Sequence, residues 1–171
     1  TVFVHKIVGA LAEKDATLKE VEAVAKKVVE NVRSMGMALT PCTVPAAGKP
    51  GFELGENEIE IGMGIHGEPG IEKTQIQPAD EIAQILLEKI LDDLKLEEND
   101  KVAVMINGLG ATPLMELYIM NKKVSEVLKE KNIYIHETFV GEFMTSLEMA
   151  GCSISLLKLD DQLIELLDAQ A

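Results

Sequence analysis

The chain has 171 residues, of which 47% are hydrophobic, so it can fold as one globular domain with a sizeable core. Aromatic residues make up only 4% and Trp is absent, so we expect that core to be aliphatic. Sixteen basic and 29 acidic residues give a formal charge of −13. A surface this negative argues against nucleic acid and anionic membranes as partners. No apolar run is long enough to span a bilayer.

Two isolated cysteines, Cys42 and Cys152, form no Cys-x-x-Cys pair, and no secretory signal is recognisable. This usage predicts a reduced, cytoplasmic setting. The chain opens Thr-Val-Phe-Val without an initiator Met and leads directly into a helical pattern. That opening favours a fragment of a longer protein over a processed complete chain.

Apolar residues at helical spacing predict two helices at the start of the chain, over residues 2–14 and 18–33. Thr17 precedes the second helix and Glu20 follows three residues later, which is the sequence of a capping box. Because the turn between the two helices is short, we expect them to pack antiparallel.

A break at 34–36 ends the second predicted helix, and a strand is expected over 37–44. Residues 45–57 are rich in Pro and Gly and read as a loose connection. Within it, Phe52 and Leu54 are expected to make a short pairing at a sheet edge.

Residues 58–70, EIEIGMGIHGEPG, carry the strongest candidate for chemistry. Alternating apolar side chains predict a half-buried strand over 58–65, and Gly62 and Gly64 leave one of its faces open to close approach. His66 follows where this strand ends and a Gly- and Pro-rich turn begins, which is a common place for a chemical group on a rigid support. A histidine at a strand end is also often a surface or hydrogen-bonded structural residue, so both interpretations stay open.

The remaining elements alternate between helices and strands. A helix is predicted to begin at residues 77–80 and to run to about 94, and another to run from 113 to about 131. Strands are predicted over 102–106, 133–140 and 152–159. A short helical piece is expected at 143–149, and Asp160 is expected to cap a last helix that runs through Leu167. This order predicts an α/β fold of the α+β type, with one mixed sheet covered by helices. A doubly wound parallel sheet fits less well, because the first strands follow each other with no helix between them.

Residues 107–113, NGLGATP, form a glycine-rich turn between a buried strand and a helix. Thr112 is the expected N-cap and Pro113 the first helical residue. Such a turn can hold an anion at the helix N-terminus. It matches neither G-x-G-x-x-G nor the P-loop pattern and contains no Lys, so a tight strand-to-helix turn is favoured.

The other polar residues offer little chemistry. We expect His5 to lie on a helix surface or between helices, and His136 to be a satisfied structural residue. No metal-ligand spacing is present, so no metal site is expected. Glu68, two residues after His66, either orients the imidazole or simply lies on a loop. His66 is therefore a candidate nucleophile or acid/base without evident partners in the sequence.

Two stretches together resemble the dihydroxyacetone kinase family. They are MALTPCTVPAAGKPGFELGENEIEIGMGIHGEPG (37–70) and NGLGATPLMELYI (107–119), and the opening VHKIVGALAE (4–13) is also similar. The resemblance covers essentially the whole chain and is to the C-terminal half of the subunit or domain that binds dihydroxyacetone. It implies that residues 1–171 form a single domain of a two-domain protein. It also implies a two-layer sandwich with a mixed sheet of about six strands.

The resemblance implies a covalent role for His66. In the family, the imidazole Nε2 of this histidine adds to the ketone carbon of dihydroxyacetone and forms a hemiaminal. Neutral imidazole is a competent nucleophile near neutral pH, and glycerol, which has no carbonyl, cannot form the adduct. The held triose would present a terminal hydroxyl for phosphoryl transfer. Gly64, Gly67 and Glu68 correspond to the substrate-binding loop.

The stretch that begins at Asn107 also matches the family. No catalytic role is carried over to Asn107, Gly108 or Gly110. These residues are expected to shape the wall of the site or a docking surface for the partner that carries the nucleotide.

The resemblance implies that the rest of the machinery lies outside this chain. The acid/base Asp and a second His belong to the family's N-terminal domain, and ADP or ATP with Mg²⁺ is carried by a separate L subunit or a fused helical domain. The chain ends soon after Leu167, which favours the branch that depends on the phosphoenolpyruvate sugar phosphotransferase system. We therefore expect a cytoplasmic homodimer in glycerol metabolism. The 171-residue chain alone should fold without phosphorylating anything.

Some relatives in this family keep the triose-binding histidine but act as ligand-sensing coactivators of transcription without kinase activity. His66 does not separate the two classes, because both can retain it. The glycerone kinase and coactivator functions therefore both stay open at the level of the sequence.

Overall fold

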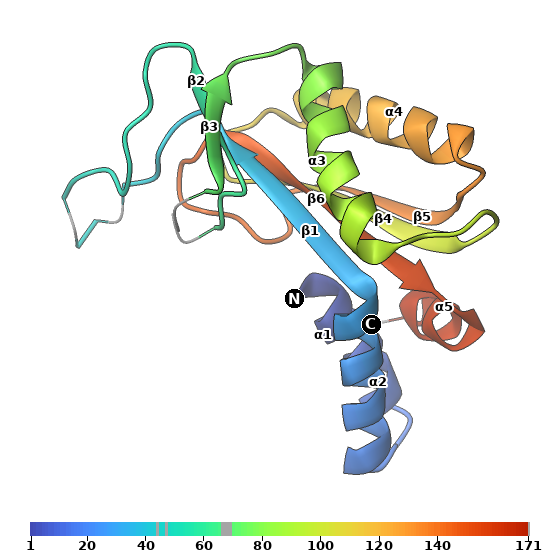
Figure 1. Ribbon diagram of the computed structural model, residues 1–171. Coiled ribbons are helices and arrows are strands. Elements are labelled where there is room, and N and C mark those ends of the chain that lie inside the picture. The colour runs from blue at the N-terminus through green and yellow to red at the C-terminus, as the bar shows by residue number, and fades with distance from the viewer. Residues whose placement is uncertain (44, 47, 66–69, 171) are drawn as a thin grey trace.

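The structure is a computed structural model that describes residues 1–43, 45–46, 48–65 and 70–170 (Figure 1). Its helices and strands in chain order are α1 (Val2–Ala12), α2 (Leu18–Asn31), β1 (Val32–Ala38), β2 (Glu58–Ile61), β3 (Glu72–Gln75), α3 (Ala79–Leu94), β4 (Lys101–Gly108), α4 (Leu114–Glu130), β5 (Tyr134–Gly141), β6 (Gly151–Leu159) and α5 (Asp161–Asp168). None of these helices combines the length and the apolarity that crossing a bilayer would need.

The strands form one six-stranded sheet in the order β3-β2-β1-β6-β4-β5. β4 and β5 are parallel, while the other neighbouring pairs are antiparallel. The predicted mixed sheet of about six strands is therefore confirmed. The long central strands β1, β6 and β4 pair over most of their length, and they carry the residues that matter for the site.

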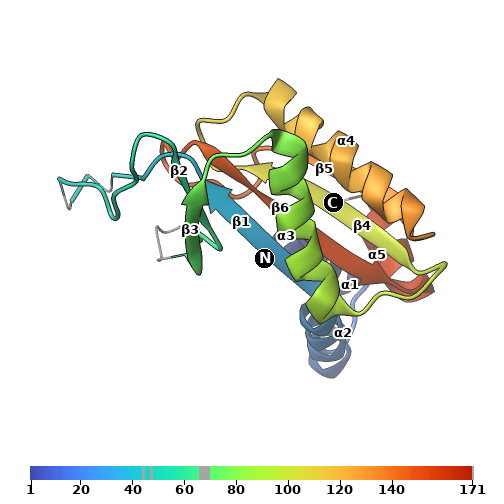
Figure 2. The same ribbon diagram turned by 45° about the horizontal axis from the view of Figure 1, so that its top comes forward.

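Helices cover the two faces of the sheet unequally. α3 and α4 pack over one face and bury the main aliphatic core, including Leu86, Ile106 and Ile154. α1, α2 and α5 form a second cluster on the opposite face around Ile7 and Leu157. Figure 2 shows α3 and α4 in front of the sheet and α1, α2 and α5 behind it. The second cluster covers only one end of its face, so the other end of that face is free to form a site.

The boundary between α2 and β1 differs from the prediction. The capping box of Thr17 and Glu20 is present as predicted, but α2 ends at Asn31 and β1 begins at Val32 without a turn. The predicted helix to 33 and strand over 37–44 are therefore wrong at this point. Val32 pairs with Leu157 of β6, and that long-range pairing overrides the local helical pattern.

Two smaller predictions also fail, and one strand was missed. Residues 143–149 contain no helix, and the described residues around Phe52 make no strand pairing. The strand β3 was not predicted. The sequence of β3, EKTQ, has no apolar alternation, because this edge strand exposes most of its side chains. Edge strands of this kind are held by backbone pairing, which leaves little trace in the residue pattern.

Asp160 caps α5 as predicted, and we expect its loss to destabilise the domain. Its carboxylate accepts from the Leu163 N–H at 2.9 Å and pairs with Lys27. Replacing an N-cap Asp by Ala typically costs about 1 kcal/mol, so Asp160→Ala should lower the free energy of unfolding by about that amount. Chemical denaturation with Asp161→Ala as the control measures this, because the Asp161 side chain is almost fully exposed.

The loss in the free energy of unfolding caused by Asp160→Ala should depend on pH. Burial alone would raise the pKa of Asp160, but hydrogen bonds from Lys27 and from the Leu163 N–H hold that pKa below its usual range. A lowered pKa in the folded state stabilises the protein above the unfolded-state pKa of about 4, and this stabilisation disappears as the pH falls through the lowered value. A difference between Asp160→Ala and wild type that persisted unchanged to the lowest pH would contradict this assignment.

Candidate functional site

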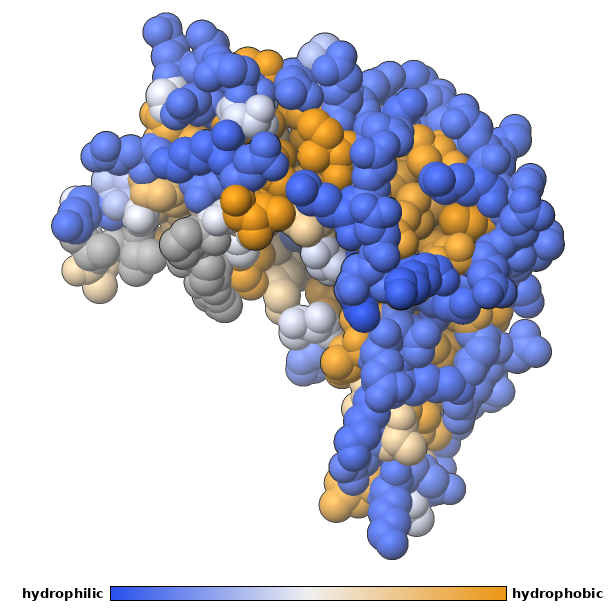
Figure 3. Space-filling view, viewed as in Figure 1, coloured by the Kyte–Doolittle hydropathy of each residue, from blue (hydrophilic) through white to orange (hydrophobic). Residues whose placement is uncertain are grey.

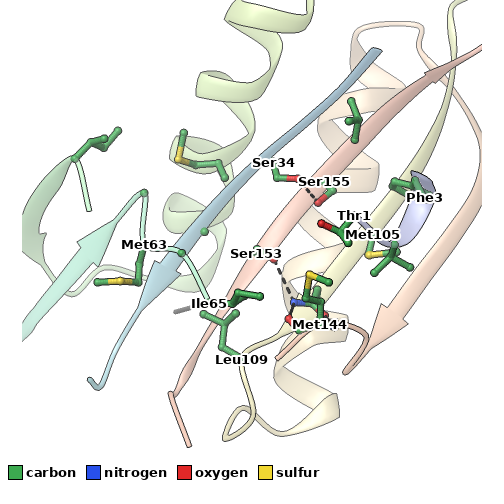
Figure 4. Close-up of a pocket in the computed structure, with 18 residues that line it drawn as sticks. Thr1, Phe3, Ser34, Met63, Ile65, Met105, Leu109, Met144, Ser153 and Ser155 are labelled. Atoms are coloured by element: carbon green, nitrogen blue, oxygen red, sulfur yellow. Dashed lines mark hydrogen bonds between the residues drawn. The ribbon is translucent and has the colours of Figure 1, made fainter. Parts of the chain in front are cut away.

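A hollow of about 500 Å³ lies on the open end of the sheet, on the face opposite α3 and α4. Its floor is formed by β1, β6 and β4, and its wall by the segment that follows β2 (Figure 4). Figure 3 shows the molecular surface hollowed between the loops near β2 and the α1–α2 pair. Gly64 and Ile65 line the wall of this hollow. Among the described cavities, it is therefore the one whose lining residues come closest in sequence to His66.

Polar side chains form a row across the floor of this hollow. Ser34 of β1 pairs in register with Ser155 of β6, and their hydroxyl oxygens lie 2.5 Å apart. Ser153 of β6 lies in register with Asn107 of β4, and the Asn107 amide donates to the Ser153 hydroxyl at 3.4 Å. Hydroxyl and amide groups of this kind can hydrogen-bond a small polar ligand and fix its orientation.

The wall begins where β2 ends. Gly62 has a φ of +85°, a left-handed conformation that favours glycine, so the predicted strand over 58–65 stops at Ile61. The Gly62 N–H donates to the carbonyl of Gly36 at 2.7 Å. A Cβ on Gly36 would lie 2.7 Å from the carbonyl oxygen of Met63. Gly36 and Gly62 therefore bring the wall against β1. The close backbone approach that the sequence predicted at Gly62 is confirmed.

The chain returns to β2 after residues 66–69. The Ile71 N–H donates to the carbonyl of Ile61 at 2.8 Å, and Ile61 then pairs with Glu72 of β3. Gly62, before the undescribed residues, is thus bonded to β1, and Ile71, after them, is bonded to β2. His66, Gly67 and Glu68 themselves lie outside the described residues, and their predicted roles stay predictions.

Asn107 is one of two buried polar side chains among the described residues, the other being Glu60. Its amide nitrogen donates to the carbonyl of Met144 at 2.8 Å. Its amide oxygen accepts from the backbone N–H groups of Phe143 and Met144, both at 2.9 Å. Asn107 therefore ties the segment after β5 to the end of β4, and Met144 lines the hollow through this contact.

The glycine-rich turn after β4 is not built to hold an anion. The Leu109 and Ala111 N–H groups donate to the carbonyls of Gly151 and Met149, and the Gly110 N–H donates to Glu142 Oε2 at 3.2 Å. These amides are occupied, and a carboxylate at the turn would repel a phosphate. The tight-turn interpretation of residues 107–113 therefore holds. Gly108 and Gly110 pack against Glu142 and the segment at Leu147, and Leu109 is the residue of this turn that reaches the hollow beside Asn107.

Thr112 does not cap α4, contrary to the prediction. Pro113 occupies the N-cap position and α4 begins at Leu114. The Thr112 hydroxyl instead donates to the carbonyl of Gly151 at 2.7 Å and accepts from its N–H at 2.8 Å. Since Gly151 opens β6, this pair of bonds fixes the start of the strand that supplies Ser153.

The cysteines and His136 have structural surroundings. Burial raises the pKa of the Cys152 thiol to about 12, so its reactive thiolate is suppressed. Cys42 is also buried. His136 Nε2 lies 2.9 Å from Asp168 Oδ1 and links β5 to α5, in agreement with the structural role expected for it. Within the described ranges, no three His, Cys, Asp or Glu side chains gather where they could hold a metal ion.

Sequence reasoning missed the serines of the floor. In β6, CSISLLKL, Ser153 and Ser155 alternate with Ile154 and Leu156, which face the α3–α4 core. That alternation was visible and could have placed both serines on one face. Their proximity to Ser34 could not be foreseen, because it depends on the pairing of β1 with β6 across more than 100 residues.

The described residues form an α/β domain with a mixed six-stranded sheet and five helices. A family model of the Dak1 domain matches residues 1–171. The chain belongs to the Dak1 domain family, which confirms the resemblance drawn from its sequence.

Curated relatives and solved structures agree with this assignment. One relative is 52% identical to this chain over 162 residues, which are 95% of this chain and 49% of that protein. It is the protein from Listeria innocua serovar 6a named PTS-dependent dihydroxyacetone kinase 1, dihydroxyacetone-binding subunit DhaK. The structure of the dihydroxyacetone kinase operon co-activator Dha-DhaQ superposes with a TM-score of 0.91 at 32% identity, covering 98% of this chain and 52% of that one. The dihydroxyacetone kinase from C. freundii, in complex with AMP-PNP and Mg²⁺, gives a TM-score of 0.87 at 29% identity, covering 99% of this chain and 31% of that one. The chain spans about half the length of the Listeria relative.

Proposed function

We propose that this chain is the C-terminal half of a dihydroxyacetone-binding subunit, and that His66 captures dihydroxyacetone as a hemiaminal for phosphorylation. The observation that carries this proposal is the hollow of about 500 Å³, whose wall runs to Ile65, the residue before His66. Its floor offers the hydroxyls of Ser34, Ser153 and Ser155 to a small polyhydroxy ligand. The similarity to a dihydroxyacetone-binding subunit supports the same ligand.

The capture step needs no reactant other than the imidazole and the ketone. The lone pair of neutral His66 Nε2 forms a bond to the carbonyl carbon, and the electron pair of the C=O π bond moves to oxygen. That oxygen gains a proton and the imidazole loses its Nδ1 proton, so the adduct contains every atom of the triose. A triose offers little apolar area for binding, and a covalent bond supplies what contact area cannot.

The remaining components are proposed to lie on other parts of the assembly. The acid/base groups would come from the N-terminal domain of the parent protein. In the phosphotransferase-dependent branch, a nucleotide-binding L subunit would carry ADP with Mg²⁺. That ADP would be rephosphorylated to ATP, and the ATP would donate the phosphoryl group. The glycine-rich turn beside Glu142 supports this division, because its amides are already occupied by protein groups. We propose a homodimer in the cytoplasm as the working form.

A regulatory function is the second candidate. The high structural similarity to a dihydroxyacetone kinase operon co-activator favours it specifically. A coactivator of this kind would bind dihydroxyacetone without phosphorylating it. The two functions share the capture step and differ in whether the triose is turned over.

Intact-mass spectrometry of the full-length parent protein with dihydroxyacetone tests the proposal. We expect a mass increase of one triose with dihydroxyacetone and none with glycerol. A kinase assay with the partner subunit and its donor then separates the enzyme from the sensor, and the isolated 171-residue chain should show no turnover. Folded parent protein that carried no adduct, by mass and by ¹³C NMR of labelled dihydroxyacetone, would contradict the proposed function.

A further inference from the structure

The first two turns of α4 are apolar on both sides of the helix. Leu117 and Met120 are buried in the main core, as the inward side of a surface helix requires. The outward side of the same turns exposes four large apolar side chains, Leu114, Met115, Tyr118 and Ile119. This outward side is called the α4 face below. A helix that is apolar all round is normally buried on every side, so we expect another surface to cover the α4 face.

A cavity of about 210 Å³ adjoins the α4 face, where the beginnings of α3 and α4 lie side by side (Figure 2). It is lined by Glu116 and Ile119 of α4, by Ile82 of α3 and by Ile76, which is itself 52% exposed. Its volume lies below the range of about 300–1,000 Å³ that is usual for small-molecule pockets. An apolar cavity of this size suits one large side chain, and anchoring side chains of protein partners occupy such cavities. The α4 face is therefore suited to a protein.

The α4 face and the hollow lie on opposite faces of the sheet. The helices α3 and α4 cover one face, and the hollow opens on the other. Under the proposed function, the N-terminal domain and the nucleotide-bearing subunit must both reach a triose in the hollow. Thr1, which the N-terminal domain would precede, also lines the hollow. A second copy of the protein is the remaining component of the proposed assembly, and it has no need to reach the hollow.

The charges of the α4 face suit contact with a copy of itself. With a formal charge of −13, two copies repel each other over most of their surfaces. Residues 114–126 of α4 instead carry two acidic and two basic side chains: Glu116, Glu126, Lys122 and Lys123. The repulsion between two copies is therefore weak where two such neutral surfaces meet.

The order of these charges along α4 fits an antiparallel pair of helices. A two-fold axis that passes by Ile119 sets residues equally far before and after Ile119 opposite each other. Glu116 of one copy then lies opposite the partner's Lys122, and the same pair recurs on the other side of the axis. Both side chains are exposed, and Lys122 lies 3.6 Å from Glu126 of its own helix. The exposed apolar side chains of the α4 face lie between the two charge pairs, which is the usual arrangement of an apolar centre within a polar rim.

We propose that the α4 face is the surface through which two copies of the protein form a two-fold dimer, with α4 packed antiparallel against the partner's α4. This inference rests on the proposed function, because that function brings the other components to the face of the sheet that carries the hollow. A stable interface buries about 800 Å² on each partner. The α4 face supplies its apolar centre, and the cavity beside Ile76 receives a side chain of the second copy.

Sedimentation equilibrium of the full-length parent protein, without ligand, measures this self-association. Met115 is 72% exposed, and Met115→Asp places a charge in the centre of the interface. The dissociation constant of the dimer should rise at least about 10-fold. Leu18→Asp is the matched control, because Leu18 is 82% exposed in the first turn of another helix, α2. An acidic residue suits the first turn of a helix at both positions, so both variants should keep their unfolding temperature, and Leu18→Asp should dimerise like wild type.

Charge reversal tests the antiparallel arrangement. Glu116→Lys alone and Lys122→Glu alone each set like charges opposite each other, and each should weaken the dimer about 3- to 10-fold. The double variant Glu116→Lys/Lys122→Glu restores opposite charges across the interface and should return to within about 3-fold of wild type. Glu116 and Lys122 are not neighbours on one helix, where contacts join residues three or four apart, so a contact within α4 does not explain such a rescue.

The outcomes separate the second copy from other partners. A wild-type parent protein that sediments as a monomer, or a Met115→Asp variant that dimerises as well as wild type, would overturn the proposal. So would a double variant that dimerises no better than the single ones. An intact dimer of Met115→Asp that no longer binds the nucleotide-bearing subunit would assign the α4 face to that subunit. An intact dimer with a lowered unfolding temperature would assign it to the N-terminal domain.

The same experiments distinguish a failure of this inference from a failure of the proposed function. Sedimentation needs no dihydroxyacetone, so its result stands whether or not mass spectrometry detects an adduct. A dimer that depends on Met115 in a protein that forms no adduct would uphold the interface and contradict the proposed function. An adduct on a protein whose dimer ignores all the α4 variants would do the reverse.

Discussion

Replacing His66 with alanine is expected to abolish the covalent dihydroxyacetone adduct. In the proposed mechanism Nε2 supplies the bond to the ketone carbon, and alanine has no nucleophilic atom. The hydroxyls of Ser34, Ser153 and Ser155 would still be present, so weak non-covalent binding can persist. Intact-mass spectrometry at a fixed triose concentration measures the loss directly.

His5 provides the control for this experiment. It lies exposed on α1, so His5→Ala removes an imidazole without touching the wall of the hollow. His5→Ala should keep the full mass increase, and both variants should unfold at the same temperature as wild type. An adduct that survives in His66→Ala would show that another nucleophile captures the triose, and the proposed role of His66 would be wrong.

Replacing Asn107 with alanine is expected to destabilise the domain and loosen one side of the hollow. The change leaves the carbonyl of Met144 and the N–H groups of Phe143 and Met144 without their partner. Partly buried polar groups left unpaired cost about 1–3 kcal/mol each, less where water can replace the partner, so we expect a total loss of about 2–3 kcal/mol. Denaturation with urea measures this free energy, and dihydroxyacetone binding should weaken in the same variant.

The variant Ser153→Ala separates the effect of Asn107 on the stability of the domain from its effect on ligand binding. Within the part of the chain that the structure describes, the Ser153 side chain makes one hydrogen bond, a long one of 3.4 Å from Asn107, and it lines the same part of the floor. Its replacement should leave the free energy of unfolding nearly unchanged and weaken the binding of the triose. If Asn107→Ala were as stable as Ser153→Ala, the bonds to Phe143 and Met144 would not hold the segment after β5.

The elements that sequence reasoning placed correctly are those with strong local signals. The capping box at Thr17, the buried run of β4 and the N-cap Asp160 each depend on residues that are close in the chain. The helix expected at 143–149 failed because Asn107, more than 30 residues away, binds the backbone there in another conformation. Val32 became a strand residue for a similar reason, through its pairing with β6.

The site was only partly visible in the sequence. The glycines around His66 signalled close backbone approach, and Gly62 makes such an approach. Glu60 looked like any other of the 29 acidic residues, because neither its spacing nor its neighbours reveal that it is buried. Burial of a single charge depends on how β1, β2 and β3 are paired, and that pairing is fixed by the whole sheet.

Strand β6 serves two purposes through alternate positions. Ile154 and Leu156 point into the core beneath α3 and α4, while Ser153 and Ser155 face the hollow. Under the proposed function, substitutions at the serine positions would change which ketoses fit without removing a core side chain. During evolution, a protein with this domain could therefore acquire a new substrate preference at little cost in folding stability. The reason is that adjacent β6 residues are selected separately, one set for packing in the core and the other for contact with the ligand.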